Sequence, residues 1–133
     1  MLMTEPFFDS NVVLYMLSTE AAKADRSAAL LAAGGIISVQ VLNECFSVAR
    51  RKLKYSLPEI DSFLKLVRAN CQVLPVTVEG HDLGRKVHER FGLQIYDSMI
   101  VAAAQLSGCA VLYSEDMHNG LNIGGLTICN PYK

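Results

Sequence analysis

The stretch PFFDSN (residues 6–11) carries the strongest indication of how this chain folds. Pro6 to Phe8 is a short apolar run typical of a buried β-strand, and the carboxylate of Asp9 follows it directly. Burying an ionised carboxylate is costly unless hydrogen bonds or a cation compensate its charge. Asp9 is therefore expected either to cap the helix that follows the strand or to bind a ligand there.

Short apolar strands alternate with helical patterns along the rest of the chain. Strands are expected at 6–8, 36–39, around Val73, 109–114 and 126–130, and helices at 11–17, 20–33, 41–53, after Ser56, 79–91 and 95–106. Such alternation requires crossover connections between parallel strands. The pattern predicts an α/β fold of three layers, with a mostly parallel central sheet of about five short strands flanked by helices.

Local signals define two of these helices. Ser56-Leu57-Pro58-Glu59 matches a capping box, and Gly92 follows the 79–91 helix as a stop signal. Two apolar stripes at helical spacing predict the buried faces of the 41–53 helix and the helix after Ser56. They are Leu42, Cys45, Ala49 and Leu53 in the first helix, and Ile60, Phe63, Leu64 and Val67 in the second.

Length and composition indicate one domain covering residues 1–133. Hydrophobic residues make up 51% of the chain, enough for a substantial core. Twelve Lys and Arg oppose thirteen Asp and Glu, so no overall positive field attracts nucleic acid. Any chemistry on nucleic acid must therefore depend on local groups or on a metal ion.

The four cysteines predict free thiols rather than disulfides or a zinc site. They are far apart, lack a C-x-x-C pair and lie in apolar surroundings, which is typical of buried thiols in a reducing compartment: Cys45, Cys71, Cys109 and Cys129. No basic residue precedes Lys23, so a secretory signal is not expected. No apolar run is long enough to span a membrane. A cytoplasmic protein is predicted.

Four carboxylates interrupt apolar sequence near the ends of predicted elements: Asp9, Glu44, Asp97 and Asp116. In an open parallel sheet, ligands bind beyond the carboxyl ends of the strands. Asp9 and Asp116 both follow strands and are expected in that crevice. Clustered carboxylates raise one another's pKa unless a cation compensates, and Mg²⁺ or Mn²⁺ prefers such oxygen ligands.

Each of these acids also has a purely structural explanation. Asp9 would cap a helix, and Asp97 would interact with the dipole of the helix that it opens. Glu44 would pair with Arg50 or Arg51 on its own helix, and Asp116 would stabilise a turn. Four such coincidences at one crevice are less expected than one shared site.

Four segments together resemble the acidic motifs of the PIN-domain family, the nuclease fold of VapC-type toxins. They are FFDSNVVLY (7–15), VLNECF (41–46), YDSMIVAAA (96–104) and LYSEDMHNG (112–120). The resemblance extends over essentially the whole chain. It implies a Mg²⁺- or Mn²⁺-dependent endoribonuclease in which Asp9 and Asp97 are the main metal ligands. Glu44 and Asp116 match the second and fourth acids, which complete the site directly or through water.

The same resemblance implies supporting groups and partners. Asn11 and Ser114 match polar positions that support the acids or a substrate phosphate. The choice between Glu115 and Asp116 as the inward-facing acid stays open, although alignment with Ser114 favours Asp116. An RNA substrate, an antitoxin protein and a homodimer are expected. Helical geometry places Arg51 two turns after Glu44 on nearly the same face, so it is a candidate contact to an RNA phosphate. Its structural alternative is a solvated basic residue favoured by the dipole at the helix end.

Two other functions are alternatives to a nuclease. A strand-terminal Asp also serves as the phosphorylated nucleophile of signalling domains, but a second acid close to it and a lysine near the later strand end are missing here. A PIN fold that binds RNA or a partner without catalysis is the other alternative. The three histidines, His81, His88 and His118, have no metal-binding spacing, and no phosphate-binding loop is present.

Overall fold

The computed structural model describes residues 5–133, so part of the N-terminal stretch in which no signal was expected lies outside the described residues. The described chain forms one six-stranded sheet in the order β3-β2-β1-β4-β6-β5. All neighbours are parallel except β5 and β6. The strands are β1 (Phe7–Phe8), β2 (Gly35–Ser38), β3 (Cys71–Leu74), β4 (Val111–Tyr113), β5 (Asn122–Ile123) and β6 (Leu126–Cys129).

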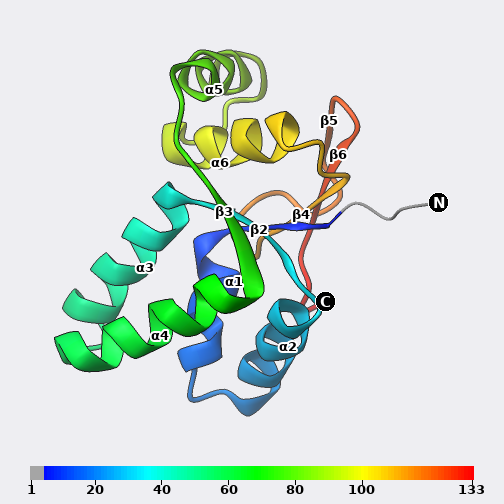
Figure 1. Ribbon diagram of the computed structural model, residues 1–133. Helices are drawn as coiled ribbons and strands as arrows, with labels where there is room; N and C mark the ends of the chain where they lie inside the picture. Colours follow the sequence, from blue (N-terminus) through cyan, green and yellow to red (C-terminus); the bar gives the residue numbers. More distant parts are fainter. Residues whose placement is uncertain (1–4) are drawn as a thin grey trace.

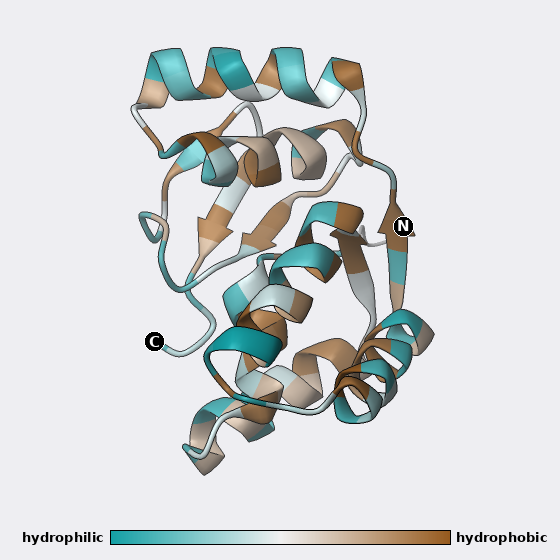
Figure 2. Cartoon of the chain, turned by 90° about the vertical axis from the view of Figure 1, so that its left-hand side faces the viewer, coloured by the Kyte–Doolittle hydropathy of each residue, from teal (hydrophilic) through white to brown (hydrophobic). Residues whose placement is uncertain are grey.

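Helices cover both faces of the sheet, which confirms the predicted three-layer α/β architecture. They are α1 (Ser10–Leu14), the 3-10 helix η1 (Tyr15–Leu17), α2 (Ala21–Ala32), α3 (Val39–Arg51), α4 (Leu57–Asn70), α5 (Val78–Phe91) and α6 (Ile95–Leu106). Helices α5 and α6 lie on one side of the sheet, and α1 to α4 lie on the other (Figure 1). Figure 2 shows hydrophobic strands enclosed between these two helical layers.

The sheet has one strand more than the expected number of about five. The segment 122–123 pairs antiparallel with the start of β6 through a tight turn at Gly124 and Gly125. Both glycines have positive φ, 57° and 89°, which a two-residue hairpin requires. Two residues are too few to produce a recognisable strand pattern, so only the pairing reveals β5.

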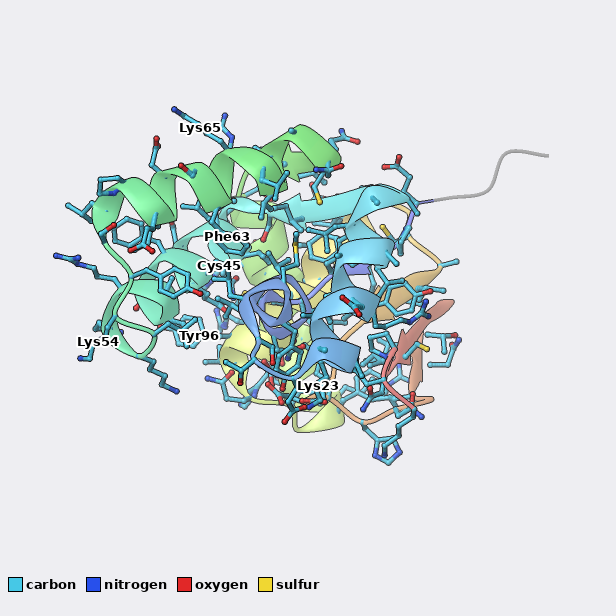
Figure 3. The ribbon with its side chains drawn as sticks, turned by 90° about the horizontal axis from the view of Figure 1, so that it is seen from below. Lys23, Cys45, Lys54, Phe63, Lys65 and Tyr96 are labelled. Carbon is cyan, nitrogen blue, oxygen red and sulfur yellow. The ribbon has the colours of Figure 1, made fainter. Side chains whose placement is uncertain are left out.

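Strand β1 lies at the centre of the sheet and is buried on both sides. Phe7 and Phe8 have no exposed surface, and the Phe8 ring stacks on Tyr113 of β4 with centroids 6.1 Å apart. On the face covered by α1 to α4, Phe63 of α4 points into the core whereas Lys65 points to solvent (Figure 3). The strand that precedes Asp9 is therefore held on all sides by packing.

The capping box is confirmed, but the expected stripe on α3 is partly wrong. Ser56 accepts from the Glu59 backbone, and the Glu59 side chain accepts from the Ser56 backbone. Helix α3 begins two residues earlier than expected and ends at Arg51. Its buried face consists of Val41, Cys45 and Ala49, whereas Leu53 lies beyond the helix and is 41% exposed.

The cysteines are free, as predicted. Three are buried, whereas Cys129, the last residue of β6, is half-buried. Burial raises the pKa of Cys71 and of Cys109 to about 11, so these thiols are protonated near neutral pH. Within residues 5–133, no helix combines the length and apolarity needed to cross a bilayer.

The close packing of β1 against β2 leaves no room for a side chain at Gly35. An added Cβ at this position would lie 2.7 Å from Cζ of Phe8 and 2.9 Å from the carbonyl oxygen of Pro6. We expect Gly35→Ala to lower the free energy of unfolding by about 1–3 kcal/mol, measured by urea denaturation, because the carbonyl cannot move without displacing β1. The double variant with Phe8→Leu should lose less unfolding free energy than the two single variants lose in total. Wild-type stability of Gly35→Ala would contradict this packing.

Candidate active site

The topology brings the first and fourth acidic motifs together at one edge of the sheet. Strands β1 and β4 are parallel neighbours, so both carboxyl ends lie on the same edge. The Asp9 amide donates to the Tyr113 carbonyl at 3.0 Å, which aligns the residues that follow the two strands. At β1 the connections change direction, since β2 and β3 lie on one side and β4 on the other. This is the position at which open α/β sheets bind ligands.

Asp9 is buried and held by short hydrogen bonds. Its side chain is the N-cap of α1, accepting from the Ser10 amide at 2.7 Å. Its other oxygen accepts from the Ser114 hydroxyl at 2.8 Å. Only 5% of the residue is exposed. Asp9 therefore does cap α1, as its structural explanation requires. The cap contact uses one of its two carboxylate oxygens, so capping does not exclude binding of a further group.

Asn11 connects Asp9 with the loop after β4. Its side-chain amide donates to Asp116 at 2.9 Å and to Asp9 at 3.4 Å. Its side-chain oxygen accepts from the Glu115 backbone amide at 3.2 Å. One side chain thus orients both the loop backbone and the two carboxylates of the first and fourth motifs.

Glu44 reaches the same edge from the second turn of α3. One carboxylate oxygen accepts from the Ser10 hydroxyl at 2.6 Å, and the other accepts from the Gln40 amide at 2.7 Å. The Gln40 amide also donates to the Tyr96 carbonyl at 3.2 Å. Glu44 is bound by polar neighbours instead of the surface pair with Arg50 or Arg51 that was its structural alternative.

Asp97 lies in the first turn of α6, as its helix-dipole explanation requires. Its backbone amide is capped by the Gln94 side chain at 3.0 Å. The carboxylate itself makes no hydrogen bond to the described residues. It is therefore free to accept a ligand from the crevice.

The four carboxylates interact electrostatically. Burial raises the pKa of Asp9 from 3.8 to about 6; hydrogen bonds from Ser114 and Ser10 oppose this effect, and the charges of Asp97 and Glu44 add to it. Burial also raises the pKa of Asp97, and the charges of Asp116 and Glu44 raise it further. Each acid acts on at least one other, so they form a single negative cluster.

The donor set of this cluster fits a hard divalent cation. All four candidate side chains offer carboxylate oxygens, which Mg²⁺ and Mn²⁺ prefer. In the part of the chain that the structure describes, no group of three or more His, Cys, Asp or Glu side chains is placed to hold a metal ion. Mg²⁺ is usually held by one or two carboxylates together with several waters, so a complete protein cage is not required.

The structure distinguishes Glu115 from Asp116, a choice that the sequence left open. Glu115 turns away from the cluster. Its carboxylate accepts from Lys23 at 2.8 Å and from the Tyr15 hydroxyl. Asp116 contacts Asn11 beside Asp9. Asp116 is thus the acid of this pair that lies at the cluster.

A cleft of about 1170 Å³ extends from the cluster between α3 and α6. Glu44 and Asp97 lie in its wall, together with apolar groups such as Val76 and Tyr96. Arg51 is exposed at the end of α3 and donates to Ser47 at 2.7 Å, and Ser47 also lines the cleft. Arg51 is therefore hydrogen-bonded to a residue of the cleft wall.

Three side chains that orient the acids were missed in the sequence. Gln40 precedes Glu44 by four residues, a helical spacing that could have revealed their contact. Ser10 contacts Glu44 across 34 residues, and nothing in the sequence indicates that pairing. Gln94 caps α6, a position at which glutamine is not among the preferred residues.

A model of the family described as the PIN domain matches residues 7–118. The chain belongs to the PIN-domain family. The matched range contains all four acids. Comparison with curated proteins finds no match.

Solved structures of toxin systems share this PIN fold. A toxin–antitoxin complex from Klebsiella pneumoniae aligns with a TM-score of 0.73 at 16% identity, covering 96% of this chain and 98% of the other. Mycobacterium tuberculosis VapC20, a sarcin-ricin loop cleaving toxin, aligns with a TM-score of 0.69 at 16% identity, covering 84% and 89%. Rickettsia felis VapBC2, bound to a DNA fragment from its promoter, aligns with a TM-score of 0.66 at 20% identity, covering 92% and 96%. At these identities the likeness establishes the fold.

The stability of the metal-free protein tests the electrostatics of Asp9. Its folded-state pKa of about 6 lies above the unfolded value, so the folded state binds a proton more readily and stability falls as pH rises through 6. We expect Asp9→Asn, measured by urea denaturation with chelator at pH 7.5, to be more stable than wild type. The gain is up to about 3 kcal/mol, from roughly two pKa units at 1.36 kcal/mol each.

The advantage of Asp9→Asn should shrink towards pH 4, where wild-type Asp9 is protonated in the folded state. Asp61→Asn is the matched control, because Asp61 is exposed and its ion pair among the described residues is with Lys65 on α4. Its stability should change by no more than about 0.5 kcal/mol. Destabilisation of Asp9→Asn at both pH values would contradict a strained carboxylate at this position.

Proposed function

We propose that this protein is a Mg²⁺- or Mn²⁺-dependent endoribonuclease and the toxin of a toxin–antitoxin pair. The observation that supports it best is the cluster of four carboxylates around the buried Asp9, whose pKa is raised where a cation would lower it. A structural role alone gives no reason to concentrate like charges at one sheet edge. Membership of the PIN-domain family and the fold shared with toxins such as VapC20 support the same function.

In this proposal Asp9 and Asp97 hold the metal ion directly, and Glu44 and Asp116 complete the site directly or through water. The ion, when bound, supplies a Lewis acid that lowers the pKa of a water and offsets charge on the scissile phosphate. Ser114, Ser10 and Asn11 keep the carboxylates oriented through the hydrogen bonds described above. No side-chain nucleophile is required.

The substrate in this proposal is RNA with an accessible single-stranded segment. The cleft beside Glu44 and Asp97 offers room for nucleotides next to the scissile phosphate, and its apolar wall suits unstacked bases. Arg51 is proposed to contact a backbone phosphate near the cleft mouth. The formal net charge of −1 provides no general attraction, so such local contacts matter for binding.

The proposed partners are an antitoxin and a second copy of this chain. The Klebsiella pneumoniae and Rickettsia felis structures are toxin–antitoxin assemblies, which supports a protein inhibitor for this chain. An antitoxin arginine placed among the carboxylates would compensate their charge in place of a metal ion. The expected compartment is the cytoplasm.

Cleavage of a mixed structured RNA pool tests the nuclease assignment. We expect cutting by the purified protein with Mg²⁺ or Mn²⁺ and none with chelator. Asp9→Asn and Asp97→Asn should lower the rate at least about 100-fold, because loss of a direct ligand should exceed the 10–100-fold cost typical of outer-shell changes.

Asp61→Asn is again the matched control, since it makes the same chemical change on α4 away from the cluster. It should cut RNA at the wild-type rate. Equal cutting by the two site variants would remove the catalytic assignment. No cutting by the wild type at any metal concentration would favour a non-catalytic PIN module that binds RNA or a partner.

The role of Arg51 is tested by separating binding from chemistry. We expect Arg51→Gln to raise KM about 3- to 10-fold with little change in kcat. The slope of log affinity against log salt concentration should decrease by about 1, the effect of losing one phosphate contact. Arg85→Gln, which removes an exposed arginine from α5, is the control and should leave both parameters unchanged. An unchanged KM and salt slope for Arg51→Gln would exclude the phosphate contact.

A further inference from the structure

We propose that Lys23, Tyr15 and Glu115 form a clamp that positions the carboxylate of Asp116 in the acidic cluster. This inference rests on the proposed function and names positioning residues for its site. The three residues lie outside the four acidic positions, and among the described residues none of their side chains hydrogen-bonds to Asp9, Glu44 or Asp97. We call this group the Glu115 clamp.

The Glu115 carboxylate uses both of its oxygens in the clamp. One accepts from the Lys23 ammonium at 2.8 Å, and the other accepts from the Tyr15 hydroxyl. The Lys23 nitrogen also lies 4.5 Å from the centre of the Tyr15 ring, a distance typical of a cation–π contact. Each member of the clamp therefore contacts both of the others.

The clamp is more shielded from solvent than an ordinary surface ion pair. The side chains of Lys23 and Glu115 are 28% and 23% exposed, whereas those of Lys65 and Asp61 on α4 are 75% and 65% exposed. Exposed pairs contribute little because water and salt screen them. The better-shielded pair is suited to hold a loop in one position.

The C-terminal segment covers the clamp. The Tyr132 ring packs edge-on against Tyr15 with centroids 5.2 Å apart, and the Lys23 nitrogen lies 5.6 Å from its centre. The Tyr132 hydroxyl is 2.6 Å from that of Ser27 on α2. Arg26 of α2 donates to the Pro131 carbonyl at 3.1 Å. Helix α2, η1 and the end of the chain thus pack together around the clamp. Figure 3 shows Lys23 at α2.

The clamp and Asn11 hold the loop after β4 from two directions. The Glu115 side chain reaches Lys23, while the Glu115 backbone amide donates to Asn11 at 3.2 Å. The next residue, Asp116, accepts from the same Asn11 at 2.9 Å and is otherwise exposed. On the other side of Asp116, the buried Met117 donates its amide to the Ser114 hydroxyl at 3.4 Å, so the clamp fixes the side of Asp116 that this contact does not.

The clamp also keeps a fifth negative charge away from the cluster. Glu115 is adjacent to Asp116 and could otherwise turn towards the same crevice. The positive charge of Lys23 holds the Glu115 carboxylate on the opposite side of the loop. An unpaired Glu115 would compete with Asp116 for a bound cation.

Mn²⁺ binding by calorimetry tests the clamp independently of catalysis. We expect Lys23→Met to raise the Kd for Mn²⁺ about 10-fold, in the range found for residues that orient metal ligands. Lys65→Met, the same change in the exposed pair of α4, should leave the Kd unchanged. Hydrogen exchange of the metal-free protein should show reduced protection of residues 114–117 in Lys23→Met only. This exchange also reports whether the variant keeps its fold elsewhere.

A double-mutant cycle with Asp116→Asn identifies the route of the effect. If the clamp acts through Asp116, Lys23→Met should cause no further loss of Mn²⁺ affinity once Asp116 is replaced. Glu115→Gln should also raise the Kd, because it weakens the contact with Lys23, but by less than Lys23→Met, because it leaves no unpaired carboxylate to compete for the cation. A 10-fold loss that persists in the Asp116→Asn background, or an unchanged Kd in folded Lys23→Met, would overturn the clamp.

The outcomes for the clamp and for the nuclease are distinguishable. Wild-type protein that binds Mn²⁺ and cuts RNA while Lys23→Met behaves normally overturns the clamp alone. Wild-type protein that binds Mn²⁺ without cutting RNA overturns the nuclease, and the Kd comparison still decides the clamp. Absence of Mn²⁺ binding at millimolar concentration overturns both, because Asp116 then has no cation for which to be positioned.

Discussion

The burial of the Asp9 carboxylate at the end of the central strand is the constraint on which the site depends. A charge at this depth is unfavourable, and the surrounding groups offset only part of the cost. Ser10 and Ser114 hydrogen-bond it, and Phe7 and Phe8 prevent the strand from moving it towards water. A chain that keeps such a residue gives up stability locally, which is typical of functional sites.

The central position of β1 converts distant sequence into a compact site. Ser114 and Asp9 are 105 residues apart, yet they are hydrogen-bonded because β1 and β4 pair in parallel. Helices α3 and α6 then bring Glu44 and Asp97 to the same edge from opposite faces of the sheet. The acids thus come from four separate elements held by one rigid core, which suits a site that must hold a cation in a defined position.

The polar groups around the acids form two levels of support. Ser10, Asn11, Ser114 and Gln40 contact the carboxylates directly, while the Glu115 clamp holds the loop that carries Asp116. Carboxylates of like charge repel one another, so their positions depend on such external contacts. This explains why amides and hydroxyls contact the carboxylates of the acidic cluster.

The sequence by itself determined the layer architecture, the helix 95–106 and the location of the acids at element ends, because periodicity, capping boxes and strand-terminal carboxylates are local signals. It misjudged Leu53, whose exposure depends on where α3 ends, and it missed β5, which exists only through pairing. Only the tertiary structure decided that Asp116 faces the cluster while Glu115 turns to Lys23, 92 residues away. Two adjacent acids in a loop have the same local chemistry, so only contacts from distant elements can separate their roles.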